Sequence, residues 1–194
     1  LVFVASNILQ TDRDIDRIFI EYGLIPAQLN GGGGYTTLIS SMFLHSGFMH
    51  LAGNMLFLWV FGDNIEDALG HIKYFFFYLL CAAGAGFAHA FFHPASEAPL
   101  IGASGAVAGV VAAYIILHPR IKIWVLALGR IPLRLSAMWV LGAWIVMQVY
   151  NLFAATESEV AWMAHIGGLI CGAALVLLLK RVEVPLFDRG LNTP

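Results

Sequence analysis

The chain has 194 residues, of which 60% are hydrophobic and 11% are charged, and its mean hydropathy is +0.81. Soluble domains carry about 25% charged residues, so this composition excludes an ordinary water-soluble core and indicates a polytopic helical membrane protein. The net charge of −2 gives no reason to expect a nucleic-acid partner. Both cysteines, Cys81 and Cys171, lie within apolar runs, which excludes a disulfide framework.

The chain begins with an apolar fragment, residues 1–9, that is too short to cross a bilayer, since about 20 residues are needed. We interpret this fragment as the outer end of a first helix whose beginning is missing from the chain. Residues 10–46 then form a long outer connection that contains four consecutive glycines at 31–34. Its hydrophobic members predict a piece that lies in the membrane interface. They are Ile18, Phe19, Ile20, Leu24 and Ile25.

Five longer apolar runs follow, each separated from the next by Gly, Pro or charged residues. They cover about 47–62, 72–92, 104–118, 135–154 and 162–180. Together with the first helix they predict an all-α polytopic membrane protein. We expect a six-helix bundle that forms a single transmembrane domain over residues 1–194, with the long outer loop after the first helix.

Basic residues set the expected orientation, because eight of the ten lie on one side of the predicted spans. These eight are Lys73, Arg120, Lys122, Arg130, Arg134, Lys180, Arg181 and Arg189. The other side carries Arg13 and Arg17 among acidic residues that include Glu157 and Glu159. The positive-inside rule assigns the side with eight basic residues to the cytoplasm. The runs at 47–62, 104–118 and 162–180 then begin on the outer side.

Polar side chains occur within the runs at three places, although such groups are costly in a bilayer and usually face the protein interior or water. His50 and Asn54 are four residues apart and share one helix face. Ser104 and His165 each stand near the start of a run. At 1.5 Å per residue, Ser104, His165 and His50 lie about 20–22 Å from the cytoplasmic ends of their helices. All three therefore fall in one layer, about 8–10 Å below the outer surface of a hydrocarbon core about 30 Å thick.

Glycine spacing predicts that two of these runs pack closely. Gly105 and Gly109 form one small-residue face, and Gly168 and Gly172 form another. Such faces let helix backbones approach in lipid. Ser104 and His165 stand at the outer ends of these two faces, so close packing would bring them together.

A serine beside a histidine suggests nucleophilic catalysis, because the histidine can act as the base that activates the hydroxyl. Ser104 would begin its helix, where unpaired backbone N–H groups and the positive end of the helix dipole can stabilise a developing oxyanion. The side chains of His50 and Asn54 can add further donors.

Each signal alone has a simpler interpretation. Ser104 could cap a packing helix, and His165 could be a structural hydrogen-bonding residue. His50 and Asn54 could tie helices together, and His45 could have a structural role in the outer connection. The conjunction of a serine, a histidine and donor groups at one height favours the catalytic interpretation.

His89 and His93 have the i,i+4 spacing of metal ligands, but no acidic or thiol residue is close to them in the sequence. We therefore expect neither a metal site nor a cofactor.

At these residues the sequence resembles the rhomboid family of intramembrane serine proteases, and the resemblance covers nearly the whole chain. The family pattern HxxxxHxxxN appears as His45, His50 and Asn54. Its GxSG pattern occupies residues 102–105, and its AHxxG pattern occupies residues 164–168. The stretch GDNIEDALG resembles the segment that follows the second span in these proteins.

The resemblance implies a rhomboid-like bundle with a Ser–His dyad, in which Ser104 is the nucleophile and His165 is the general base and then the acid. It implies an oxyanion hole made by His50, Asn54 and the backbone N–H of Ser104. The supporting residues carried over from the motifs are His45, Gly102, Gly105 and Gly168. The implied substrates are transmembrane helices of other proteins in the lipid bilayer, cut near their outer ends and often after a small residue.

The sequence departs from the family pattern at two places. Many members carry Trp-Arg in the first outer loop, where this chain has Tyr35, Thr36 and Thr37. Some carry an aromatic residue one turn after the serine, stacked under the histidine, where this chain has Ala108. The second departure leaves open what orients His165.

These observations favour a bacterial-type serine endopeptidase of the inner membrane, with its active site toward the periplasmic or extracellular side. The oligomeric state stays open. Two alternatives are a catalytically inactive rhomboid-like protein that binds membrane clients, and a small transporter. A transporter would be expected to carry charged residues at mid-depth, and the five runs have none there.

Overall fold

The structure, a computed structural model, describes residues 12–127, 129–154 and 160–188. The body of the described chain consists of long helices that overlap the five predicted runs, and the first of them continues seven residues beyond the predicted end at 62. They are α5 (Phe48–Leu69), α6 (His71–Phe92), α7 (Ser104–Leu117), α8 (Ala137–Ala154) and α9 (Trp162–Leu179). The prediction of an all-α polytopic membrane fold is confirmed. The proposed first helix at 1–9 lies outside the described residues, as do Glu157, Glu159 and Arg189.

Three of the described helices, α6, α8 and α9, are long and apolar enough to cross a membrane. α5 is 22 residues long but carries polar residues near both ends, including His50 and Asp63. α7 has only 14 residues, and every residue from Gly105 to Tyr114 is buried. A helix that is apolar on all sides belongs in the interior, so α7 is enclosed by other helices and has little contact with lipid.

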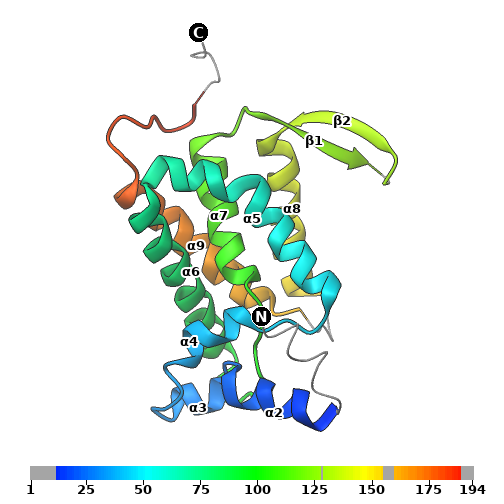
Figure 1. Cartoon of the computed structure of the whole chain (residues 1–194), viewed down its shortest axis with the longest axis vertical. Helices are drawn as coiled ribbons and strands as arrows, with labels where there is room; N and C mark the ends of the chain where they lie inside the picture. Colours follow the sequence, from blue (N-terminus) through cyan, green and yellow to red (C-terminus); the bar gives the residue numbers. More distant parts are fainter. Residues whose placement is uncertain (1–11, 128, 155–159, 189–194) are drawn as a thin grey trace.

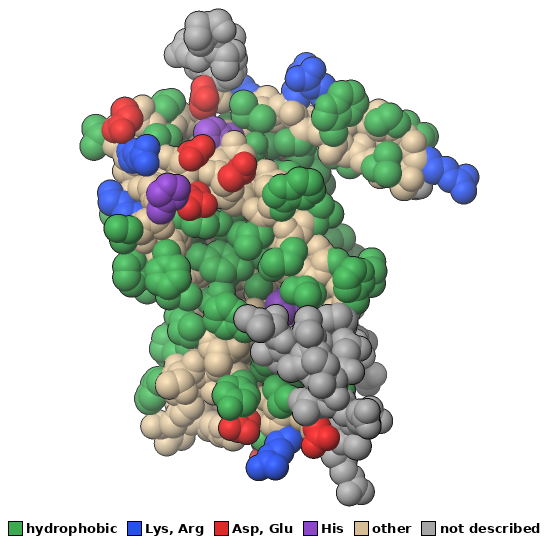
Figure 2. Space-filling view, viewed as in Figure 1, with side chains coloured by type: hydrophobic (Ala, Val, Ile, Leu, Met, Phe, Trp, Pro, Cys, Tyr) green, Lys and Arg blue, Asp and Glu red, His purple; other side chains and the backbone are tan. Residues whose placement is uncertain are grey.

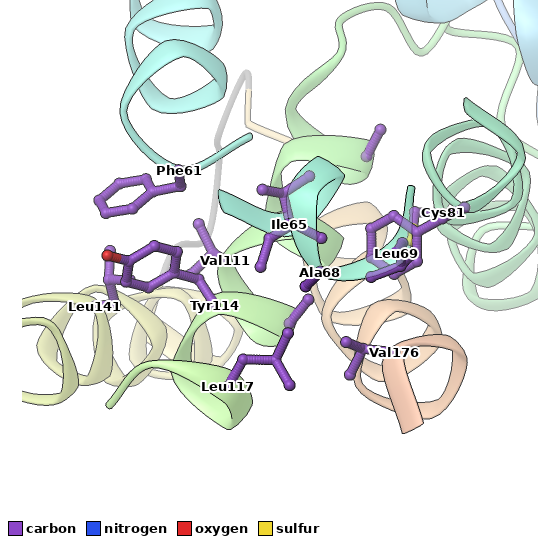
Figure 3. Close-up of a cluster of buried hydrophobic side chains, with 14 of the residues drawn as sticks. Phe61, Ile65, Ala68, Leu69, Cys81, Val111, Tyr114, Leu117, Leu141 and Val176 are labelled. Atoms are coloured by element: carbon purple, nitrogen blue, oxygen red, sulfur yellow. The ribbon is translucent and has the colours of Figure 1, made fainter. Parts of the chain in front are cut away.

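α7 runs through the centre of the bundle, with α6 and α9 on one side and α8 on the other (Figure 1). Its contacts with α9 and with α6 are extensive, and α5 also packs along it. Along α7, from Ala106 to Leu117, these helices share one buried apolar cluster (Figure 3). There the rings of Phe61 and Tyr114 meet edge to face, with centroids 4.9 Å apart. Such packing fixes α5 against α7 and so aligns the outer end of α5 with Ser104.

The outer connection is built from short helices. They are α2 (Asp12–Tyr22), α3 (Pro26–Asn30), α4 (Thr37–Ser40) and the 3-10 helix η1 (Ser41–Phe43). Leu24 and Leu100 form an antiparallel bridge, with N–H···O distances of 3.0 and 2.8 Å. The connection is therefore tied to the segment that leads into Ser104.

One part of the expectation for this connection was wrong. Leu24 and Ile25 do not lie in a membrane interface, because they are buried inside the protein, with 0% and 6% of their surface exposed. The backbone bridge to Leu100 holds them there. Ile20, in α2, is 57% exposed and remains available to the interface.

Between α7 and α8 the chain forms a β-hairpin that the sequence did not suggest to us. Strand β1 (Lys122–Ala127) pairs antiparallel with β2 (Ile131–Ser136), in a register that puts Trp124 opposite Arg134. Gly129 has a φ of +68°, a conformation that suits glycine in a tight turn. The hairpin lies at the end of the bundle opposite α2 and α3 (Figure 1).

Candidate active site

The segment before α7 brings His50 against Gly102, two residues before Ser104. Gly102 has a φ of +113°, which L-residues rarely adopt, and its N–H donates to the Ser41 carbonyl at 3.0 Å. A Cβ at Gly102 would lie 2.7 Å from both Cε1 and Nε2 of His50. Only glycine therefore permits both this turn and the approach of the imidazole, two residues before the serine.

The two small-residue faces meet, as their spacing predicted. A Cβ on Gly168 would overlap the carbonyl oxygen of Gly105, and a Cβ on Gly172 would overlap that of Gly109. α7 and α9 thus touch backbone to backbone over two turns. This contact sets how far apart Ser104 and His165 can be.

Ser104 and His165 are in direct hydrogen-bond contact, with 2.7 Å between the serine Oγ and the histidine Nε2. The other ring nitrogen, Nδ1, lies 2.7 Å from Oε1 of Gln148 on α8. An amide oxygen can only accept, so with the Gln148 amide in this orientation Nδ1 carries the proton. In the neutral imidazole Nε2 is then the acceptor, and the serine hydroxyl donates to it.

Gln148 was missed in reading the sequence. It is the polar residue most deeply buried in α8, with 2% of its surface exposed. The available signal was its position inside an apolar run, where an uncharged polar side chain still needs a partner. The rings of Trp144 and Trp162 lie around the same imidazole, with centroids 6.2 and 5.9 Å from that of His165. These contacts orient the ring without an aromatic residue at Ala108.

The remaining residues of the predicted site gather at the outer end of α5. Asn54 is buried and its Nδ2 donates to the carbonyl of His50 at 3.0 Å, which leaves its second N–H uncommitted. Nδ1 of His50 lies 3.1 Å from the Ser46 hydroxyl. His45 is buried, and its ring meets that of His50 edge to face at 5.1 Å. This packing holds the His50 ring toward Gly102.

A small cavity of about 20 Å³ adjoins the serine, with Ser41, Gly102, Ser104, Gly105 and Ala164 among its lining residues. One water molecule needs about 10–15 Å³ of this kind of volume. The site thus combines a serine hydroxyl, a histidine hydrogen-bonded to it, further polar side chains and room for a water. This set of groups can perform acyl transfer and hydrolysis.

Within the described residues, no group of three or more His, Cys, Asp or Glu side chains is arranged to hold a metal ion. His89 and His93 stack on one another with centroids 4.6 Å apart. Nδ1 of His93 lies 3.2 Å from the backbone carbonyl of His89 at the end of α6.

Comparisons with known proteins point to one family. The family model described as the Rhomboid domain matches residues 32–182. The chain is 31% identical over 142 residues to RHOMBOID-like protein 6, mitochondrial, of Arabidopsis thaliana. This match covers 73% of this chain and 43% of that protein. It is 32% identical over 170 residues to Rhomboid protease AarA of Providencia stuartii, covering 80% of this chain and 60% of that protein.

A second bacterial relative is Rhomboid protease GluP of Bacillus subtilis, 31% identical over 175 residues. That match covers 89% of this chain and 31% of the relative. The chain therefore spans less than two thirds of the length of each of these relatives, and it matches them over most of its own length.

Proposed function

The chain belongs to the rhomboid family, and from that premise we propose that this integral membrane protein is an intramembrane serine endopeptidase. The observation that carries the proposal is the 2.7 Å contact between Ser104 Oγ and His165 Nε2. It joins two helices at the outer ends of their small-residue faces, where a serine that served only as a helix cap would need no base.

In the proposed reaction Ser104 Oγ attacks the scissile carbonyl carbon while His165 Nε2 takes the hydroxyl proton. The C–N bond then breaks as the imidazolium returns that proton to the leaving amine, which leaves an acyl group on Ser104. A water molecule, deprotonated by His165, attacks this ester and releases the new carboxyl end and the free serine. The cavity beside Ser104 is a site from which this water can come.

The oxyanion of each tetrahedral intermediate needs donors. The Ser104 N–H at the start of α7 has no partner within its own helix, and the His50 side chain on α5 lies against Gly102, two residues before the serine. Asn54, one turn further along α5, is the other proposed donor. Gln148 is a positioning residue in this scheme, because its amide oxygen keeps the proton of His165 on Nδ1. Gly102, Gly105, Gly168 and His45 shape the site without taking part in the reaction.

The proposed substrates are transmembrane helices of other proteins. A helix must unwind before its peptide bonds can reach a serine, so a cleavable segment should contain Gly, Pro or other helix-weakening residues. We place the protein in the cytoplasmic membrane of a bacterium, as a single domain over residues 1–194 whose site opens to the outer side. Two bacterial relatives support this location, although the family also has mitochondrial members.

The test is cleavage of a tagged single-span substrate by the purified protein in proteoliposomes. We expect the parent protein to cut it, and Ser104→Ala to be inactive while it unfolds at the same temperature. Alanine suits both the helix and the packed face, so loss of activity would not reflect loss of fold. Binding of the substrate without cleavage by the parent protein would instead support the catalytically inactive alternative.

A further inference from the structure

The β1–β2 hairpin projects sideways from the bundle, at the level where α7 ends and α8 begins (Figure 1). Its main contact with the described helices is with α8, which follows it directly in the chain. An isolated two-stranded hairpin is marginally stable in water. Contacts with α8 and the packing of Ile123 against the core cluster hold its base, so a surface outside the described chain would add to the stability of the arm.

The two faces of the hairpin differ in chemistry. Alternation along the strands and the register place one set of side chains on one face: Ile123, Val125, Ile131, Leu133 and Leu135. The opposite face carries another set: Lys122, Trp124, Leu126, Pro132, Arg134 and Ser136. Hence one face is wholly apolar, and the other combines two basic residues with a tryptophan that is 71% exposed.

The charge of the segment has one sign. Residues 118–136 contain four basic residues, Arg120, Lys122, Arg130 and Arg134, and no acidic residue. All four are exposed, and Figure 2 shows Lys and Arg side chains at the tip of the arm and above the point where it leaves the bundle. The surface is thus complementary to an anionic partner.

We propose that the hairpin lies flat on the cytoplasmic leaflet and binds anionic lipids. Its apolar face enters the boundary of the acyl chains, and its basic face, with Trp124, lies among the headgroups. Three observations converge on a lipid surface as the occupant: the arm leaves the bundle where two apolar helices end, its exposed apolar side chains continue into exposed Met138 and Trp139 of α8, and its charge is positive. Tryptophan and basic side chains are the residues enriched at this depth, and cytoplasmic leaflets are anionic.

The proposal does not depend on proteolysis, so it is tested with a structural measurement on the whole chain. Nitroxide labels are attached at Leu133→Cys, on the apolar face, and separately at Leu126→Cys, on the basic face. The background is Cys81→Ala/Cys171→Ala, and the protein is reconstituted in nanodiscs of phosphatidylcholine alone or mixed with phosphatidylglycerol. Collisions with oxygen report lipid contact, and collisions with a water-soluble nickel chelate report exposure to water.

In the anionic discs we expect the label at position 133 to collide mainly with oxygen and the label at position 126 to collide more with nickel. Lys122→Gln should lower the ratio of lipid-contacting to water-exposed label at position 133 about fivefold, since a basic residue near an anionic leaflet contributes about that factor. Arg17→Gln, a matched loss of charge on α2, should leave the ratio unchanged.

Three results would overturn the proposal. The first is strong nickel access at both positions in both kinds of disc, which would place the arm in water. The second is the same oxygen contact with and without phosphatidylglycerol, which would mean that the hairpin does not need anionic lipid to bind the membrane. The third is shielding of both labels from both reagents, which would mean that a second copy or another protein covers the arm.

Discussion

The two hydrogen-bond partners of His165 sit on helices that are held in very different ways. Ser104 begins α7, which is enclosed on all sides and touches α9 through glycine backbone. Gln148 belongs to α8, in which Ala137, Leu141 and Gln148 are buried and most other residues are exposed or half-buried. The serine and the histidine are thus fixed by the backbone contact, whereas the glutamine is placed by few contacts.

The two hydrogen bonds of the imidazole therefore have separate structural origins. The Ser104–His165 distance depends on residues that have no side chain, so it should respond to any added volume at the α7–α9 crossing. The His165–Gln148 bond depends on one polar side chain of a loosely packed helix. Variants at the α7–α9 crossing and at Gln148 should therefore differ in how far they lower the rate of cleavage and in whether they also lower stability.

The largest effect is expected at the crossing. Gly168→Leu would drive a side chain into the Gly105 carbonyl and separate α7 from α9, so we expect cleavage to fall below detection. Overpacking of this kind also costs about 1–3 kcal/mol of stability, which a thermal unfolding scan in detergent would register. The matched control is Gly142→Leu on α8, where a Cβ meets no atom within 4 Å. Equal loss of activity in both variants would mean that leucine in a membrane helix, and not the crossing, is the cause.

The next effect is expected at His50 and Asn54 on α5, the proposed oxyanion donors. His50→Ala and Asn54→Ala should each lower kcat about 10²–10³-fold, because loss of one oxyanion donor typically costs about 2.7–4 kcal/mol in the transition state. KM should change little, since the oxyanion exists only after attack. Asn64→Ala, on the same helix but bonded to Asp63, is the control that should keep full activity. Full activity in both test variants would leave the backbone N–H as the sole donor.

A smaller effect on the rate of cleavage is expected at Gln148 on α8. Gln148→Leu should lower kcat about fivefold to tenfold, because it removes one neutral hydrogen bond worth about 1–1.5 kcal/mol and frees the imidazole to change tautomer. Gln148→Glu keeps an acceptor of similar length and should restore most of the activity. A purely structural glutamine would instead make the two variants alike, or would change the unfolding temperature and KM rather than kcat.

The smallest effect on the rate of cleavage is expected from a change in the substrate helix. Replacing a Gly near the cut by Leu stabilises the helical form by about 0.8 kcal/mol, so cleavage should slow about fourfold. The same replacement two or more turns away from the cut serves as the control and should leave the rate unchanged. Equal rates for the two substrates would show that local unwinding does not limit cleavage.

Much of the fold could be predicted from the sequence because hydrophobic runs bounded by Gly, Pro and charge determine where membrane helices begin and end. The β-hairpin could not be predicted in the same way, because its alternating residues form a short segment inside a stretch read only for its basic charge. Leu24 and Ile25 were misplaced for a related reason: a buried apolar residue and an interfacial one look alike until their long-range partner, here Leu100, is known.

The candidate site was predictable in part. Counting residues along each helix placed Ser104 and His165 at one depth, and glycine spacing indicated which helix faces meet. Gln148 could not be assigned, since the rotation of α8 about its own axis decides whether a polar residue points at the histidine or at another partner. That rotation depends on tertiary packing, which periodicity does not encode when a helix is apolar on most sides.

Activation of Ser104 by His165 can be tested by covalent labelling with a fluorophosphonate, followed by mass spectrometry of the peptide that carries the adduct. We predict a single adduct on Ser104 in the parent protein, and its loss in His165→Ala, because the hydroxyl would lack its base. Labelling of Ser104 at the same rate in His165→Ala, or an adduct on another serine with Ser104 unmodified, would contradict the account.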